Sequence, residues 1–444
     1  MNPEFQRNLW LELTPARLLL MTGFVLFLIA MFSAAPPGFP SSGAVATALY
    51  YFLVVLWGTR NAALSVIAEI RERTWDFQKL SSMRPFALMW GKLLGATSFT
   101  WFGGILCLPF IVYPAWRGEG LPSAAGELAI LIGQGVLAQS VSLLTSLNLI
   151  RRQHNYWRLD AFLCQVMGIV AAFSAYGFPN LLPIGPQAPF SWWGLTLQPH
   201  WFQFYSLLAF TAWALVGSTR AMRLELRSVN GPFIWLAFLA FLGLYEAGFE
   251  SWFANAGGNS IGLHAAALRL AIADLAFAFS AYGMAFLEPK DPVHFRWLTG
   301  EARSGRIGRA FLALDCWMLS FGVTLLCTLV LALALWRDPQ PIAGEPPAAL
   351  VLPLLAALGF FTRDIALFVL GRTWSRERGD FAALAALAVL YVVLPQIAGP
   401  GRSLLLPQMT APAISLVAAW MEAGAVWVWA VTRIERRQAE FTSL

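Results

Sequence analysis

The sequence predicts an all-α, polytopic transmembrane helical bundle with about twelve membrane spans. Its composition is the first reason: of the 444 residues, 58% are hydrophobic and only 12% are charged. Mean hydropathy is +0.62. A soluble domain typically has about 45–50% apolar and about 25% charged residues. Since charge is costly in a bilayer core, such a composition is typical of a protein whose main solvent is lipid.

Long apolar runs recur along the whole chain, and a helix needs about 20 such residues to cross a bilayer. We predict spans at 17–34, 44–68, 89–114, 125–148, 160–178, 203–219, 232–249, 264–287, 309–336, 348–371, 380–398 and 410–432. Many of the 20 tryptophans stand at the edges of these runs, as interfacial anchors do. We therefore expect a short N-terminal segment at 1–16, a six-span unit at 17–227 and a second six-span unit at 228–444.

The distribution of basic residues predicts the orientation, because cytoplasmic loops carry an excess of Lys and Arg. The chain has 30 basic residues. With a cytoplasmic N-terminus and alternating spans, only Arg117, Arg337 and Arg402 fall in external loops. Both termini are then cytoplasmic, and we expect the chain in the inner (cytoplasmic) membrane of a bacterium, surrounded by membrane lipids.

The segment before the first span is amphipathic. Phe5, Leu9, Trp10 and Leu13 fall on one face of a helix over residues 2–16, and the intervening positions are polar. This pattern predicts an interfacial helix that lies in the headgroup plane. The alternative is a cytoplasmic tail without regular structure.

Two segments in predicted spans resemble each other. Residues 59–66 and 362–369 both begin with Thr-Arg and are identical at five of eight positions. Internal repeats are common in transporters, so the second unit could be a divergent repeat of the first. Chance similarity in a chain rich in Ala and Leu is the alternative.

Motifs for enzymatic chemistry are missing from the sequence. A P-loop needs the pattern GxxxxGK[ST] to cradle phosphates, but the one Gly-Lys pair, Gly91-Lys92, has Phe86 and Leu93 at the other defining positions. The four cysteines lie in apolar runs without CxxC spacing, and no histidine pair has ligand spacing. We predict no catalytic residue, no metal site, no cofactor bound by this chain and no nucleic-acid partner.

The densest cluster of charge follows the second predicted span. It comprises Glu69, Arg71, Glu72, Arg73, Thr74, Trp75, Asp76 and Lys79. A short charged helix with aromatic residues, held between two spans, could lie at the membrane surface and dock into a soluble partner. An ordinary solvated loop is the alternative.

This cluster also carries a resemblance to a known family. The stretch Glu69…Arg73-Thr74-Trp75-Asp76…Leu80-Ser81…Pro85…Trp90-Gly91-Lys92-Leu93 resembles the signature of ABC-2-type transporter permeases. The family pattern has an acidic residue at the end of the second span, a Thr-x-acidic-x-Leu segment, a proline and a Gly-Lys pair. The motif covers about residues 66–95, and six-span topology covers residues 1–219. Arg73 departs from the glycine common in the family, and about twelve spans exceed the family's usual six.

The resemblance implies a permease subunit of an ABC exporter. The charged cluster would be the coupling helix, and a separate cytoplasmic ATPase subunit would bind ATP and Mg. The N-terminal segment would be the family's elbow helix. Twelve spans would form one fused permease that binds two ATPase subunits, or each chain would be half of a homodimer.

Two other classes of function remain open from the residues themselves. One is an ion-coupled secondary transporter, because charged residues inside spans are functional candidates. The other is a polytopic membrane enzyme or assembly factor that acts on lipids. The intramembrane polar candidates are Arg60, Asp274, Asp315, Arg363 and Asp364.

Overall fold

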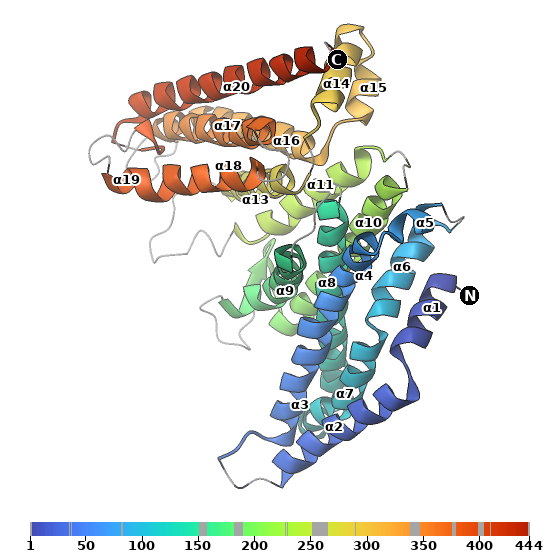
Figure 1. Ribbon diagram of the computed structural model, residues 1–444. Helices are drawn as coiled ribbons and strands as arrows, with labels where there is room; N and C mark the ends of the chain where they lie inside the picture. The colour runs from blue at the N-terminus through green and yellow to red at the C-terminus, as the bar shows by residue number, and fades with distance from the viewer. Residues whose placement is uncertain are drawn as a thin grey trace. The chain divides into compact units, whose positions relative to one another are not determined.

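The structure is a computed structural model in which the described residues are almost all helical (Figure 1). It describes the chain except residues 1, 35, 37, 81–82, 151–157, 182–189, 227, 229, 251–264, 289, 338–346, 375–378, 398–403, 409 and 443–444. The predicted external position of Arg402 lies outside the described residues. The all-α prediction is confirmed for the described part of the chain, whose two short strands form one hairpin.

The chain divides into two compact units, Met1–Phe190 with Thr196–Asn230, and Ser191–Leu195 with Gly231–Leu444. The elements of the first unit are α1 (Pro3–Glu12), α2 (Pro15–Ser33), α3 (Ser42–Tyr50), the π-helix η1 (Tyr51–Trp57), α4 (Gly58–Arg71), α5 (Trp75–Lys79), α6 (Pro85–Ala96), α7 (Ser98–Glu119), α8 (Leu121–Ile150), α9 (Arg158–Leu181) and α10 (Pro199–Glu225). The hairpin strands are β1 (Phe190–Trp192) and β2 (Leu195–Leu197).

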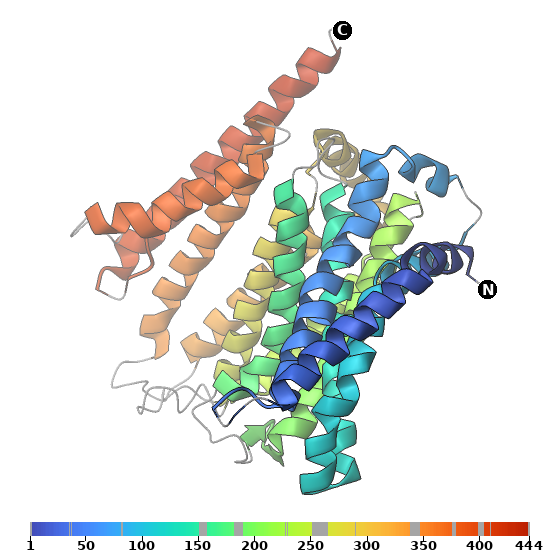
Figure 2. The ribbon, with the colours of Figure 1, turned by 60° about the horizontal axis from the view of Figure 1, so that its bottom comes forward.

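The second unit begins with α11. Its elements are α11 (Phe233–Ala247), α13 (Ala265–Leu287), α14 (Pro292–Arg303), α15 (Ile307–Leu312), α16 (Cys316–Arg337), the 3₁₀-helix η2 (Pro347–Leu350), α17 (Val351–Trp374), α18 (Gly379–Ala388), the π-helix η3 (Val389–Val393), α19 (Leu394–Ile397) and α20 (Pro412–Thr442). Within this unit, the red α20 runs alongside the orange α17 (Figure 2).

Nine helical segments among the described residues are long and apolar enough to cross a membrane, which indicates a membrane protein. They are Pro15–Ser33, Ser42–Arg71, Ser98–Gly118, Leu121–Leu149, Ala265–Leu287, Cys316–Arg337, Val351–Arg372, Gly379–Ile397 and Pro412–Arg436. Two shorter apolar helical stretches, Ala161–Ser174 and Phe233–Ala247, occupy predicted spans as well. The predicted span at 203–219 lies within α10.

Two predicted spans begin later than the sequence indicated. The run at 89–114 is two helices: α6 ends at Ala96 and α7 begins at Ser98, and the intervening Thr97 leaves the helical region at φ −102°, ψ 0°. The run at 309–336 is also divided, since α16 starts only at Cys316. There the Glu288 carboxylate accepts the free Trp317 N–H at 2.9 Å, which stabilises a helix start at that point.

The long helical segment Ser42–Arg71 contains the π-helix η1, in which the hydrogen-bond pattern of the backbone changes. Side-chain amides of neighbouring helices donate to two of its carbonyls. Gln139 of α8 bonds the Val54 carbonyl at 3.0 Å, and Gln165 of α9 bonds the Leu56 carbonyl at 2.8 Å. Neighbouring helices therefore satisfy backbone groups that η1 displaces from the regular helical pattern.

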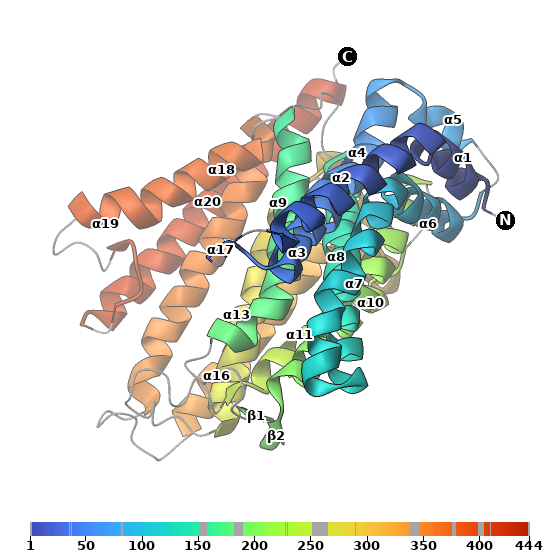
Figure 3. The same cartoon turned by 90° about the horizontal axis from the view of Figure 1, so that it is seen from below.

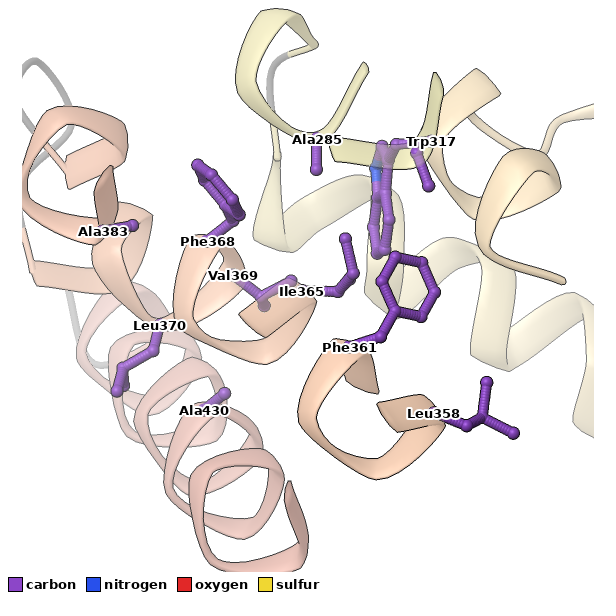
Figure 4. Close-up of a cluster of buried hydrophobic side chains, with 11 residues drawn as sticks. Ala285, Trp317, Leu358, Phe361, Ile365, Phe368, Val369, Leu370, Ala383 and Ala430 are labelled. Carbon is purple, nitrogen blue, oxygen red and sulfur yellow. The ribbon is translucent and has the colours of Figure 1, made fainter. Parts of the chain in front are cut away.

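Apolar side chains form the core of the second unit. Trp317 of α16 lies against Phe361 and Ile365 of α17, and Phe368 lies one turn further along α17 (Figure 4). Small residues, Ala285 and Ala383, let the neighbouring helices α13 and α18 approach this cluster. Dense packing of this kind fixes the positions of the polar groups on the same helices.

Candidate functional site

The charged cluster that follows the second predicted span forms a turn between two helices. α4 ends at Arg71, and the Arg73 N–H donates to the Ile70 carbonyl at 3.0 Å. The Thr74 N–H donates to the Glu69 carbonyl at 2.8 Å. This pair of bonds is a Schellman motif, and it places Arg73 in the left-handed region at φ 59°. The chain then turns into α5, so this turn interrupts the coupling helix that the resemblance implied near residues 69–82.

Lys92 of α6 lies at the centre of a buried charge network. Its side chain is 1% exposed, and its ammonium donates to the Glu69 carboxylate and, at 3.4 Å, to the Glu4 carboxylate. The ammonium also lies 3.3 Å from the Ser65 carbonyl and 5.1 Å from the centre of the Trp75 ring. A buried lysine needs such partners, because an unpaired charge in the interior is very costly.

Glu69 connects four helices through its carboxylate. Besides Lys92 of α6, it accepts hydrogen bonds from Arg7 of α1 at 2.7 Å and from Gln78 of α5 at 2.6 Å. Arg7 also pairs with Glu4 at 3.0 Å. Displacing α5 would therefore strain contacts with α1, α4 and α6 together. We call Glu4, Arg7, Glu69, Gln78 and Lys92 the Glu69 network.

Opposing effects act on Lys92. Its helix α6 is not among the candidate spans. Burial lowers the pKa of the Lys92 ammonium from its ordinary value, while the charges of Glu69 and Glu4 raise it. The net direction is downward, because desolvation is the largest effect. The proton on Lys92 therefore depends on the carboxylates beside it.

Two glycines let α1 pack closely against α6, beside which it lies (Figures 1 and 3). A Cβ at Gly91 would lie 2.8 Å from the Cβ of Glu4, and one at Gly95 would lie 2.7 Å from the Cβ of Asn8. The spacing Gly-x-x-x-Gly is typical of helices whose backbones approach closely. The glycines therefore bring Glu4 within reach of Lys92.

The polar face of α1 is turned inward. Glu4 is buried and Asn8 contacts α6, whereas Trp10 and Leu11 are exposed by 80% and 62%. The sequence predicted an amphipathic helix in the headgroup plane, with Phe5, Leu9, Trp10 and Leu13 on the lipid side. The structure contains the helix, but Phe5 and Leu9 are half-buried, and Trp10 and Leu11 carry most of the exposed apolar surface.

The eight residues of the charged cluster separate into two groups. Glu69 and Trp75 are buried, so they hold the turn together rather than face outward. The exposed members are Arg71, Glu72, Arg73, Thr74, Asp76 and Lys79. Lys79 also lies 3.6 Å from Glu225 at the end of α10, which ties α5 to a further helix.

The sequence interpretation did not include Phe77 and Leu80, an apolar tip at the end of α5, among the predicted docking residues. Phe77 and Leu80 are exposed by 76% and 84%, next to the exposed charges. It also missed Glu4, Arg7, Gln78 and Lys92 as parts of one site. The Gly91/Gly95 spacing was the available signal, since it predicts a helix packed close beside Lys92.

A second buried charge cluster lies in the second unit. Arg363 is 2% exposed and bonds Asp364 at 2.9–3.0 Å and Glu422 of α20 at 2.6 Å. Asp364 also accepts the hydroxyls of Tyr282 at 2.8 Å and Tyr391 at 2.5 Å. We expected these neighbours to point in different directions and to pair with other helices, and both do pair with other helices. In addition, the long side chain of Arg363 folds back onto Asp364.

The other intramembrane candidates have different environments. Asp274 of α13 is buried and accepts the hydroxyl of Thr328 at 2.7 Å. Asp315 lies before α16 rather than inside a span, 3.8 Å from His294. Arg60 is exposed on α4, unlike its counterpart Arg363 in the similar segment. The similarity of residues 59–66 and 362–369 therefore does not extend to the environment of the arginine.

All four cysteines are buried, and none of them forms a disulfide. Among the described residues, no group of three or more His, Cys, Asp or Glu side chains could hold a metal ion. Comparison of the chain with protein-family models, with curated proteins and with solved structures found no match in any of the three.

Proposed function

We propose that this chain is the permease subunit of an ABC exporter, and that α5 is its docking element for a separate cytoplasmic ATPase subunit. One observation carries the proposal: the exposed tip of α5, Phe77 and Leu80, is joined through the Glu69 network to helices that lead into candidate spans. An apolar tip bordered by charges is suited to a protein partner, because aromatic anchors dominate such interfaces.

The hydrogen bonds of the Glu69 network would also couple a movement of α5 to the membrane spans. A partner that moves α5 pulls on Gln78, and Gln78 is bonded to Glu69 at the end of the helical segment Ser42–Arg71. Lys92 transmits the same displacement to α6 and then to α7. The partner would bind ATP and Mg, and its two nucleotide states must contact α5 differently if they are to shift the bundle.

The proposal includes a topology and an assembly. The two shorter apolar stretches and α10 would complete twelve spans, with both termini in the cytoplasm and α1 as the interfacial elbow helix. The membrane would be the bacterial inner membrane. One chain would bind two ATPase subunits if both units act as permease halves; otherwise two chains would form a homodimer.

The test is purification of the tagged chain in mild detergent, with mass spectrometry of the proteins that accompany it. We expect an ATPase subunit that is lost with the double change Phe77→Glu and Leu80→Glu. The matched control is Phe39→Glu with Leu195→Glu, which adds the same charge at two exposed apolar positions in predicted external loops. Equal recovery of the ATPase with both variants would overturn the assignment of α5. Trp75 is unsuitable for this test, because it is buried.

A second candidate function is ion-coupled secondary transport, which the Asp364 cluster favours. In this cluster Asp364 bonds three ionisable side chains, Arg363, Tyr282 and Tyr391. Tyr391 is carried by the π-helix η3, and π-helical turns are frequent at functional sites. On this hypothesis, the purified chain alone would dissipate an ion gradient in liposomes. Asp364→Asn would abolish that flux, whereas Asp76→Asn at an exposed site would not.

A further inference from the structure

The helices α14 and α15 connect two candidate spans, α13 and α16 (Figure 1). α14 begins five residues after α13 ends, and α15 ends four residues before α16 begins. Each residue extends the chain by at most about 3.6 Å, so both helices must lie within about 18 Å of the adjacent span ends. The segment is therefore held close to the membrane surface.

One side of α14 is anchored to the second unit. Phe295 packs edge-on against Trp317 with ring centres 6.1 Å apart, and the His294 ring lies 3.1 Å from the Ala313 carbonyl. Just before α14, the buried Lys290 pairs with Asp380 at the start of α18 at 2.9 Å. These contacts fix which face of the segment is turned outward.

The exposed side chains of α14 and α15 include both apolar and cationic ones. Val293 and Ile307 are exposed by 71% and 70%, and Trp297 by 45%. Arg296, Arg303 and Arg309 are also exposed, and within the described chain none of the three forms an ion pair. In contrast, Arg306 is neutralised by Glu301 at 2.9 Å. We call Val293, Arg296, Trp297, Arg303, Ile307 and Arg309 the α14–α15 surface.

We propose that the α14–α15 surface binds the anionic headgroups of membrane phospholipids, with Val293, Trp297 and Ile307 inserted at the boundary of the acyl chains. Amphipathic helices that mix arginine with Trp and aliphatic residues lie in the membrane interface in this way. A soluble acidic partner would meet the arginines but would not account for three exposed apolar residues beside the ends of two spans. The inference is independent of the proposed ATPase docking, which uses α5 in the other unit.

The experiment is fluorescence quenching by brominated lipids in nanodiscs that hold the full chain. A fluorophore is attached at Val293→Cys, where background labelling is low because all four native cysteines are buried. We expect strong quenching that increases with the fraction of phosphatidylglycerol in phosphatidylcholine. Replacing Arg303 and Arg309 with Gln should weaken that dependence about 5-fold per arginine, since each contributes about 1 kcal/mol near an anionic surface.

Three controls decide between the outcomes. Arg117→Gln with Arg337→Gln removes the same charge elsewhere and should leave the quenching unchanged. Arg303→Lys with Arg309→Lys keeps the charge and should retain the dependence of quenching on phosphatidylglycerol. Soluble pyrophosphate should not compete. The proposal is overturned if the fluorophore is not quenched, if quenching is independent of phosphatidylglycerol, or if pyrophosphate displaces the lipid, which would assign the surface to a soluble anion.

Discussion

At the scale of single residues, the ammonium of Lys92 lies between two carboxylates from different helices. An ion pair in the interior gains little over well-packed apolar residues, because desolvation offsets the attraction. Removing one partner is different, since it leaves the other charge buried and unpaired. The Glu69 network therefore determines the geometry of the turn more than it adds to total stability.

We expect Lys92→Met to destabilise the first unit by about 3–5 kcal/mol, because Glu4 and Glu69 would lose their buried cation and keep only the half-exposed Arg7 as a partner. Thermal unfolding of the detergent-purified chain measures this loss. Arg71→Met, at an exposed position two residues from Glu69, is the control and should change stability little. Adding Glu69→Gln to Lys92→Met should recover part of the loss. A Lys92→Met chain as stable as the Arg71→Met chain would contradict the network.

Substitution of Arg73 by glycine should stabilise the protein, in contrast to Lys92→Met. Its φ of 59° costs a residue with a Cβ roughly 1–2 kcal/mol, and glycine avoids that cost. We expect Arg73→Gly to raise the stability of the turn by about 1 kcal/mol or less, because glycine also loses more entropy on folding. The same change at Arg71, inside α4, should lower stability by about 0.5–1 kcal/mol. If both variants have the same melting temperature, the left-handed backbone conformation assigned to Arg73 is wrong.

At the scale of helices, the packing of α1 on α6 joins a surface element to the bundle. α1 bends away from α2 around residues 13–14 (Figure 2), and its polar side chains enter the protein while Trp10 and Leu11 face outward. In an ordinary interfacial helix the polar face is turned toward water and the apolar face toward lipid. Here Gly91 and Gly95 let α1 pack so closely on α6 that its polar side chains contact α6.

We expect Gly95→Leu to release α1, because even a Cβ at this position would lie 2.7 Å from Asn8. Overpacking of this size costs about 1–3 kcal/mol. Trypsin cleavage after Arg7 should then become roughly 5- to 100-fold faster, since cleavage follows the population of the open form. Gly23→Leu is the control, because nothing lies within 4 Å of a Cβ there. Unchanged cleavage of the Gly95→Leu chain would show that α1 does not depend on this contact.

Hydropathy predicted the helices well because span length and apolar content are local properties of the sequence. It did not predict the break at Thr97, because the residue lies within one apolar run and no local pattern marks it. Charge clustering found the α4–α5 turn but not the burial of Trp75 or its contact with Lys92. Contacts between α1 and α6 join residues far apart in sequence, and a single sequence carries no direct signal for them beyond the glycine spacing.

At the scale of the whole molecule, the number of spans decides which elements share a side of the membrane. Nine candidate spans are found among the described residues, and α9, α10 and α11 are the helices that would complete twelve. With all three crossing, α5 and α14 lie on the same side, together with both termini. With none of them crossing, α14 lies on the side opposite to α5, because an odd number of spans separates them.

Cysteine accessibility in intact cells distinguishes these arrangements. We expect a membrane-impermeant maleimide to label Gly118→Cys, in the predicted second external loop, and to leave Arg73→Cys and Ala302→Cys unlabelled until the membrane is opened. All three positions are exposed, and the native cysteines are buried. External labelling of Ala302→Cys with Arg73→Cys protected would mean that α9, α10 and α11 contribute an even number of crossings. The twelve-span topology would then be wrong, and α14 could not reach a cytoplasmic partner bound to α5.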